Sequence, residues 1–382
     1  MNKPLSLMIF STVLAVSLFL TACGQTEPAA GGGQASPASQ NGDTSPGQPT
    51  AADGPPKEGL IALSHKSLNY YAFVAMQEAA KAKATEYGWD FESAVADFDS
   101  AKQTNQFINF INKKPLAIIS DPNDSEGLVT AVNQAKQAGI PVAIFDTPTT
   151  GGDVDFTIAF DNYKAGVLAA EEIVKKLKEK YGEEKGVVLN AYGAMSSSAW
   201  RARKEGFDDT IKKYPQITYV SVPAEGDLRK TQDATLNAIA KYGKIDAAHA
   251  PSDNPAMGIY EALKQTNMLK KVGEEGHVII VTIDAEPIAL QRIKEGWYDA
   301  TVNQDCVAYG EITVEMLHDY VLQGKPIPAK YQNDKYYWKE AEITVDNVGP
   351  HMVISPYVID KSNVDDASHW GNVAWNEYNL KY

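Results

Sequence analysis

Residues Val187–Phe207 read VVLNAYGAMSSSAWRARKEGF and contain one complete strand–loop–helix unit. Four of the first five residues are apolar and the run favours a β-strand, whereas Tyr192–Ser198 is a loop with one glycine and three serines. We expect a helix from Ala199 to about residue 213, and the hydroxyl of Ser197 or Ser198 can cap its first turn. In open α/β sheets, ligands bind at the carboxyl ends of strands, where such loops lead into helices. The stretch therefore predicts an α/β fold with a candidate site at this loop.

The two arginines of this stretch, Arg201 and Arg203, lie at the start of the predicted helix. Cations in a first helical turn oppose the helix dipole, so their presence there calls for an explanation. At least one guanidinium group could reach a polar ligand and bind it with two parallel hydrogen bonds. The alternative is a pair of solvated surface arginines, and these residues alone leave both interpretations open.

The same alternation of strand and helix continues on both sides of this stretch. Amphipathic helices, such as 73–87, 127–138, 164–180, 228–241 and 257–264, lie between short apolar segments. Repeated βα units imply parallel sheets, and ten strands in nearly 300 residues fit two doubly wound, Rossmann-like domains. The predicted strands are Leu60–Ser64, Trp89–Val95, Leu116–Ser120, Pro141–Asp146, Phe156–Phe160, Val187–Ala191, Ile217–Val222, Ala247–Ala250, Val278–Ile283 and Ala300–Asn303.

Composition excludes several classes of function. The chain has 382 residues, and its net charge of −14 argues against nucleic acid as a partner. Two cysteines far apart in sequence, Cys23 and Cys306, do not form a disulfide framework, and Cys306 reads as a small core residue. Neither a P-loop, a GxSxG motif nor histidines with metal-ligand spacing is present. We therefore expect no metal and no cofactor.

The N-terminus has the features of a lipoprotein signal. Met1–Ala22 holds one lysine and then an apolar run of 16 residues, Leu5–Leu20, which is shorter than a membrane span. An uncleaved anchor helix is the alternative. Leu20–Cys23 resembles a bacterial lipobox, which implies cleavage before Cys23 and lipid modification of its sulfur. Residues 24–58 lack aromatic residues, Ile, Leu and Val, so we expect a disordered tether there.

Polar side chains recur just past the ends of the predicted strands. Carboxylates, amides and guanidinium groups pair with sugar hydroxyls, and aromatic rings cover the C–H faces of a sugar. Asp161, Asn162 and Asp253 have a simpler explanation as helix N-caps. The candidates are Lys66, Asn69, Tyr70 and Phe73 after the first strand, Asp146 and Thr147, Arg203, Ser252, Asp253 and Asn254, Asp284, and Gln304.

Over about residues 60–322, the sequence resembles the ribose/xylose-type substrate-binding lipoproteins of bacterial carbohydrate ABC importers. This family has the type I periplasmic-binding-protein fold. The resemblance is carried by IALSHKSLNYYAF (61–73), GIPVAIFD (139–146), DVDFTIAFDNYKAG (153–166), AWRARKEGF (199–207), VIIVTID (278–284) and ATVNQ (300–304).

The resemblance implies four ligands for sugar hydroxyls and one stacking ring: Asp146, Arg203, Asp284 and Gln304, with Phe73 as the ring. Four positions depart from the family pattern: Thr147 stands for an arginine, Ser252 for an asparagine that Asn254 can replace, no aromatic lies near Gly226, and Lys66 stands for a small residue. These departures indicate a ligand other than ribose.

The resemblance also implies two lobes joined by three chain crossings, near residues 160–162, 304–306 and 352–357. The first lobe is then 59–160 plus 305–351, and the second is 161–304 plus 352–382. Phe73 and Asp146 would face Arg203, Asp284 and Gln304, and the lobes would close around the ligand. The aromatic tail from Lys325 carries strand candidates at 342–345 and 352–358, and we expect it to pack across the domain surfaces rather than form a lid.

We therefore expect a monomeric, non-catalytic binding protein, lipid-anchored on the extracytoplasmic face of a bacterial membrane. It would capture a pentose, hexose, deoxyhexose or related polyol and deliver it to the permease of an ABC importer. Two alternatives stay open: a sugar or autoinducer receptor domain that signals to a membrane sensor, and a secreted glycoside hydrolase that uses two of Asp146, Asp161 and Asp284. A sugar-responsive repressor would need a helix-turn-helix where this chain has its signal and tether.

Overall fold

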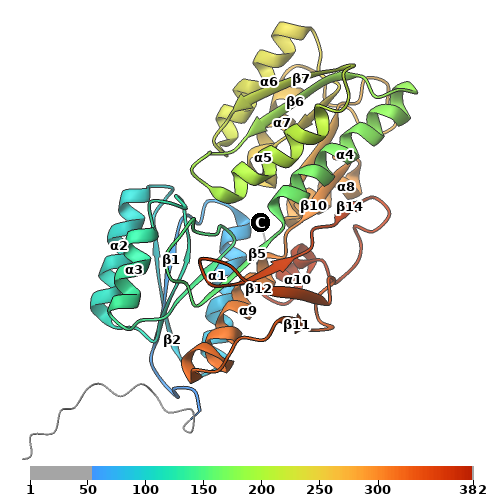
Figure 1. The fold of residues 1–382 in the computed structure, drawn as a ribbon. Helices are drawn as coiled ribbons and strands as arrows, with labels where there is room; N and C mark the ends of the chain where they lie inside the picture. The colour runs from blue at the N-terminus through green and yellow to red at the C-terminus, as the bar shows by residue number, and fades with distance from the viewer. Residues whose placement is uncertain (1–53, 381–382) are drawn as a thin grey trace, which may run out of the picture. The chain divides into compact units, whose positions relative to one another are not determined.

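The computed structural model of the protein describes residues 54–380. The predicted signal, Cys23 and most of the predicted tether lie outside this range. Among the described residues, no helix is long and apolar enough to cross a membrane. Two β-sheets, each with its own helices, make up this part of the chain (Figure 1). We call each sheet with its helices a lobe.

The first lobe contains an eight-stranded sheet in the order β11-β12-β13-β5-β4-β3-β1-β2. Its strands are β1 (Leu60–His65), β2 (Asp90–Val95), β3 (Ala117–Asp121), β4 (Val142–Phe145), β5 (Phe156–Phe160), β11 (Lys330–Gln332), β12 (Glu340–Val345) and β13 (Pro350–Ile354). Its helices are α1 (Tyr71–Glu86), α2 (Ser100–Lys113), α3 (Val129–Gln137) and α9 (Cys306–Asp319). The strands β1 to β5 pair in parallel, and β12 is antiparallel to both of its neighbours.

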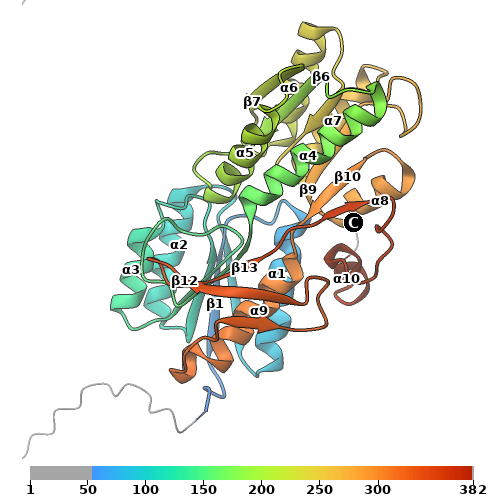
Figure 2. The same cartoon turned by 45° about the vertical axis from the view of Figure 1, so that its right-hand side comes forward.

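The second lobe contains a six-stranded sheet in the order β14-β10-β9-β8-β6-β7. Its strands are β6 (Gly186–Tyr192), β7 (Ile217–Pro223), β8 (Ala247–His249), β9 (Ile279–Asp284), β10 (Ala300–Asn303) and β14 (Val358–Asp360). Its helices are α4 (Asn162–Tyr181), α5 (Ser198–Ile211), α6 (Leu228–Tyr242), α7 (Asp253–Gln265) and α8 (Pro287–Glu295). A short helix, α10 (Trp370–Asn376), follows β14 and contacts both α8 and α9 (Figure 2).

Both lobes repeat one strand order. The parallel strands run β2-β1-β3-β4-β5 in the first sheet and β7-β6-β8-β9-β10 in the second, which is the doubly wound order of flavodoxin-like sheets. The carboxyl ends of parallel strands lie at the same edge of a sheet, so the residues after them are brought together. The predicted fold class is therefore confirmed, and all ten predicted strands are present as β1 to β10.

The chain passes between the sheets after β5, after β10 and after β13. The strand β13 pairs with β5 through Ile354, so residues 352–354 belong to the first sheet, whereas the sequence assigned them to the second lobe. The single strand predicted over 352–358 is interrupted for the same reason. Ser355–Tyr357 crosses between the sheets, and β14 then pairs with β10.

The helices α4 and α5 approach each other at two glycines, and this contact positions the N-terminal half of α5 (Figures 1 and 2). A Cβ atom on Gly166 would overlap the backbone carbonyl of Arg203, and one on Gly206 would overlap that of Tyr163. Both positions therefore require glycine. Ser197 is the N-cap of α5, because its hydroxyl accepts a hydrogen bond from the backbone N–H of Trp200 at 3.4 Å.

Candidate ligand-binding site

Arg203 lies on the buried face of α5 and only 2% of it is exposed to solvent. Its guanidinium group donates hydrogen bonds to five acceptors around it. These are Asn162 Oδ1 at 2.9 Å, the Pro251 carbonyl at 2.5 Å, Ser252 Oγ at 3.3 Å, Asp284 Oδ1 at 3.1 Å, and Gln304 Oε1. The ring of Phe160 lies beneath the guanidinium group, 5.0 Å from its carbon.

Arg201 is placed quite differently, although it is only two residues away. It is partly exposed, and its guanidinium group donates to the Met195 carbonyl in its own loop at 2.6 Å. A step of two residues turns a helix by about 200°, so the two side chains leave α5 in opposite directions. The interpretation as a surface arginine therefore fits Arg201, and the buried polar position belongs to Arg203.

Lys66 and Asp146 form the corresponding part of the first lobe. The ammonium group of Lys66 donates to Asp146 Oδ2 at 2.6 Å and to Thr147 Oγ1 at 2.8 Å. Burial alone would raise the pKa of Asp146, but the charges of Lys66 and Arg203, with hydrogen bonds from Lys66 and Thr147, hold it below its usual value. Asp146 is therefore an ionised acceptor at neutral pH.

Gln304 connects the two halves of the site. Its amide nitrogen donates to Asp146 Oδ1 at 2.8 Å, and its amide oxygen accepts from Arg203. An unbroken chain of hydrogen bonds thus runs between residues that follow strands of the two sheets. Six side chains are joined by these hydrogen bonds and those described above, and we call them the interlobe cluster: Lys66, Asp146, Thr147, Arg203, Asp284 and Gln304. All six are buried.

Asp284 is the second acid of the interlobe cluster. Burial raises its pKa to about 6, the neighbouring charge of Arg203 opposes this shift, and that of Asp146 adds to it. Its backbone has a φ of 120° at the end of β9, and the following Ala285 has a φ of 68°. Two adjacent residues with a Cβ in this region form a strained turn, of the kind that clusters at binding sites.

Aromatic side chains of the first lobe lie beside the interlobe cluster. Tyr70 and Phe73 are buried and stacked, with ring centroids 4.9 Å apart, and the ammonium group of Lys66 lies 4.9 Å from the centre of the Phe73 ring. The hydroxyl of Tyr70 donates to the Gly226 carbonyl in the second lobe. Burial raises the pKa of this hydroxyl, so Tyr70 stays neutral. A Cβ on Gly226 would overlap the ring of Trp200, which occupies this place.

The remaining candidates lie at the edge of this arrangement. Asn254 is half-buried and donates from its amide nitrogen to the backbone carbonyl of the exposed Asn69, at 3.4 Å. Asp253 is not the N-cap of α7; that position is held by Ser252, whose side chain makes no capping bond. The carboxylate of Asp253 instead accepts from the backbone N–H of Glu286 at 2.7 Å. Burial raises its pKa well above the usual value.

Sequence reasoning missed two supporting residues. Asn162 was interpreted as part of an N-cap pair; Asp161 does cap α4, but Asn162 holds Arg203. Asp121, at the end of β3, accepts from His65 Nδ1 at 2.7 Å and from the backbone N–H of Lys66 at 2.9 Å. The signal for Asp121 was available, because it directly follows the predicted strand 116–120 and shares its edge with Lys66.

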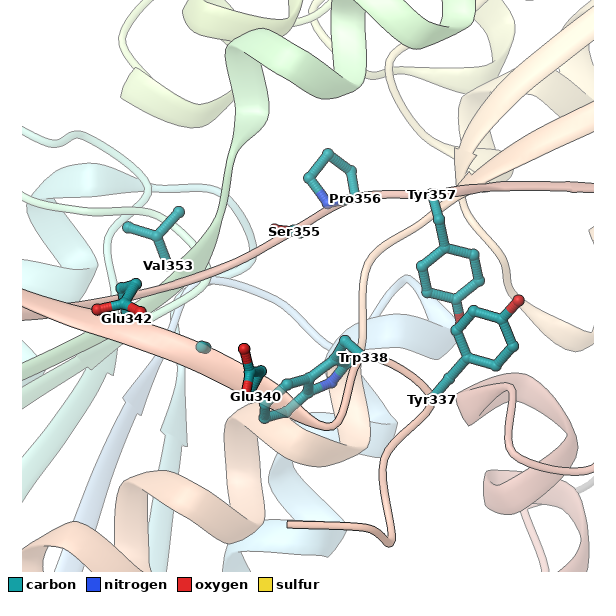
Figure 3. A pocket seen from close by; sticks show the side chains of 9 residues that line it. Tyr337, Trp338, Glu340, Glu342, Val353, Ser355, Pro356 and Tyr357 are labelled. Atoms are coloured by element: carbon teal, nitrogen blue, oxygen red, sulfur yellow. The ribbon is translucent and has the colours of Figure 1, made fainter. Parts of the chain in front are cut away.

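The C-terminal tail packs across the lobes, as expected. Tyr337 stacks on Tyr357 with centroids 4.2 Å apart, and the indole N–H of Trp338 donates to Asp305 at 3.0 Å (Figure 3). These rings border a surface hollow of about 430 Å³ beside the crossing segment Ser355–Tyr357. No member of the interlobe cluster lines this hollow. Within residues 54–380 we also find no group of three or more His, Cys, Asp or Glu side chains that could hold a metal ion.

Comparison with known families identifies the chain. Residues 61–326 match the sequence model of the periplasmic binding protein domain. The chain belongs to this family. The matched range is nearly the same as the range over which the sequence resemblance was found, about 60–322, and that resemblance is confirmed. Residues 327–380, with the aromatic tail and α10, follow the matched region.

Known members of the periplasmic binding protein family are similar over most of their length. The ribose import binding protein of Haemophilus influenzae is 30% identical over 274 residues, which are 72% of this chain and 89% of that protein. A solute binding protein of an ABC transporter from Bacillus halodurans, solved with bound myo-inositol, is 26% identical with a TM-score of 0.67. The aligned part covers 80% of this chain and 96% of that protein. Both relatives are named as binding proteins, one for ribose import and one of an ABC transporter.

Proposed function

We propose that this periplasmic binding protein captures a monosaccharide or a related polyol between its two lobes. The observation that carries the proposal is the hydrogen-bonded chain from Asp146 through Gln304 to Arg203, which joins strand ends of both sheets. Such a chain brings donors and acceptors from both lobes to one place. A ligand held there gains its full set of contacts only when the lobes are closed, and it therefore favours the closed form.

The side chains of the interlobe cluster suit a polyhydroxylated ligand. Asp146 and Asp284 can accept hydrogen bonds from hydroxyl groups, and Arg203 and Lys66 can donate to them. In the structure these groups satisfy one another, so each hydroxyl would replace one existing donor–acceptor pair and leave no buried group unpaired. The stacked rings of Tyr70 and Phe73 offer an apolar surface for the C–H face of a sugar.

The departures from the family pattern compensate one another. Thr147 stands next to Asp146, where an arginine is expected. The ammonium group of Lys66 supplies a positive charge there, at 2.6 Å from Asp146 Oδ2. An aromatic is missing near Gly226, and Tyr70 and Trp200 reach this place from other elements. The charge and the rings are kept but shifted in position, which supports a ligand with a different shape from ribose.

Delivery to the permease of an ABC importer, and anchoring through a lipidated Cys23 on the extracytoplasmic face, complete the proposal. The relatives are named as import and solute binding proteins, which supports the delivery, and the lipobox at 20–23 supports the anchor. We propose that the protein acts as a monomer, because each lobe supplies half of the site. The hydrolase alternative loses one of its three carboxylates, since Asp161 caps α4.

A thermal-shift screen tests the capture of a sugar. The purified protein is heated with pentoses, hexoses, deoxyhexoses, inositols and linear polyols, one at a time. A ligand at 100 times its Kd stabilises the folded state by about 2.7 kcal/mol, which raises the Tm measurably. At least one compound should do so, and aryl glycosides should show no turnover. A panel without any shift, or turnover of an aryl glycoside, would overturn the proposed function.

A further inference from the structure

In the turn after β9, Asp284 and Ala285 have a backbone conformation that is unfavourable for residues with a Cβ. Asp284 and Ala285 both have positive φ values, 120° and 68°. Such a turn persists only where its surroundings determine it. The backbone N–H of Ala285 donates to Thr301 Oγ1 at 3.2 Å, and the N–H of Glu286 donates to Asp253 Oδ2 at 2.7 Å. Both N–H groups of the turn are therefore held from within the second lobe.

The backbone carbonyl of Asp284 is bound by a residue that lies after the region matched by the family model, 61–326. The buried indole of Trp370, at the start of α10, donates from Nε1 to the Asp284 carbonyl at 2.6 Å. The neighbouring Gly371 lies so close that a Cβ there would stand 2.6 Å from the Ala285 carbonyl oxygen. The helix α10 thus contacts the turn with one directed hydrogen bond and one close backbone approach.

The segment that carries α10 is itself fastened to the first lobe. The hydroxyl of Tyr71, in α1, donates to the Leu380 carbonyl, and the hydroxyl of Tyr378 donates to Glu311 in α9. Tyr71 also packs against Trp370, with ring centroids 6.1 Å apart. Residues 370–380 therefore touch α1 and α9 of the first lobe as well as the turn at Asp284.

We propose that α10 is a brace for the ligand site and that Trp370 is its positioning residue. By fixing the carbonyl of Asp284, the indole N–H keeps the peptide unit after Asp284 in one orientation. The Asp284 carboxylate, 3.1 Å from Arg203, is thereby aimed into the interlobe cluster. The part of this inference that concerns affinity rests on the proposed function, whereas the part that concerns the backbone of the turn does not.

Replacing Trp370 with phenylalanine removes the N–H while an aromatic ring stays in the core, and it also removes some buried volume. Gly371→Ala is the second variant, since its Cβ presses on the same turn while Trp370 is kept. Trp375→Phe is the matched control: Trp375 lies on the same helix but is 41% exposed. Each variant is first compared with the wild type by its Tm.

Amide hydrogen exchange of the ligand-free protein is the decisive readout, because it needs no sugar. In Trp370→Phe and Gly371→Ala, the amides of Ala285 and Glu286 should exchange at least about tenfold faster, and those of β3 should not. A general loss of stability would instead speed exchange in both places. Unchanged exchange at the turn in both variants, or equal acceleration in β3, would overturn the brace.

Affinity then tests the positioning of Asp284, with the panel sugar that gives the largest rise in Tm as the probe. Trp370→Phe should weaken its binding at least about threefold, and Trp375→Phe should not change it. Faster exchange at the turn with unchanged affinity would overturn the positioning role. If no sugar in the panel binds, the proposed function fails, and the exchange experiment still decides the brace.

Discussion

Removing the guanidinium group of Arg203 should destabilise the fold even without a ligand, whereas removing that of Arg201 should not. Arg203→Ala leaves the Asp284 carboxylate buried without its partner at 3.1 Å, and the Pro251 carbonyl without its donor at 2.5 Å. Breaking a buried ion pair by removing one partner costs about 3–5 kcal/mol. Arg201 donates only to the carbonyl of Met195 from a partly exposed position, so Arg201→Ala should fall within about 0.5 kcal/mol of the wild type.

Urea denaturation at about pH 8 measures both values, because the shift in midpoint at constant slope gives the change in the free energy of unfolding. The double variant Arg203→Ala with Asp284→Asn supplies the control. It removes the carboxylate that would otherwise be stranded, so it should lose less stability than Arg203→Ala alone. Equal midpoints for Arg203→Ala and Arg201→Ala, or no recovery in the double variant, would refute the assignment of Arg203 as the central cation of the interlobe cluster.

Three further predictions concern pH, anchoring and closure. Burial raises the pKa of Asp284 to about 6, so between its ordinary pKa and about pH 6 the folded state keeps a proton that the unfolded state has lost. The protonated Asp284 therefore contributes to the free energy of unfolding below its ordinary pKa, and this contribution is lost as the pH rises to about 6. Asp284→Asn should abolish this part of the pH dependence in urea titrations, and an unchanged profile would contradict it. Cys23→Ala should block lipidation and leave sugar affinity unchanged, and a processed form that still fractionates with membranes would disprove the lipobox. A saturating sugar should reduce the radius of gyration in solution scattering, and an unchanged curve with bound sugar would exclude closure.

The sequence was sufficient to predict the strands and most of the interlobe cluster. Parallel strands place their carboxyl ends at one edge, so Lys66, Asp146, Asp284 and Gln304 could be grouped without knowledge of any contact. The residues of this stretch did not by themselves separate Arg203 from Arg201; the family resemblance selected Arg203, and the structure places it on the buried face of α5. The approach of α4 at Gly166 decides that face.

Asn162 and Trp370 were missed because their local sequence does not show the contact that each makes. Asn162 follows an aspartate at a helix start, which is the pattern of an N-cap, yet its amide oxygen accepts from Arg203, 41 residues away. Trp370 lies in a polar, aromatic tail without a clear period, and its bond to Asp284 spans 86 residues. Contacts of this kind depend on how whole elements dock, and neither helix propensity nor strand alternation encodes them.

Calorimetric titration with the sugar that the thermal-shift screen identifies tests the central claim most directly. A charge-assisted hydrogen bond contributes about 1.5–3 kcal/mol, and about 1.4 kcal/mol is a factor of ten in Kd. Arg203→Ala, Asp146→Ala and Asp284→Ala, each checked for a folded state by circular dichroism, should therefore bind at least roughly tenfold more weakly than the wild type. Arg201→Ala should bind like the wild type. Equal affinities for the Arg203 and Arg201 variants, with Asp146→Ala unimpaired, would contradict the account.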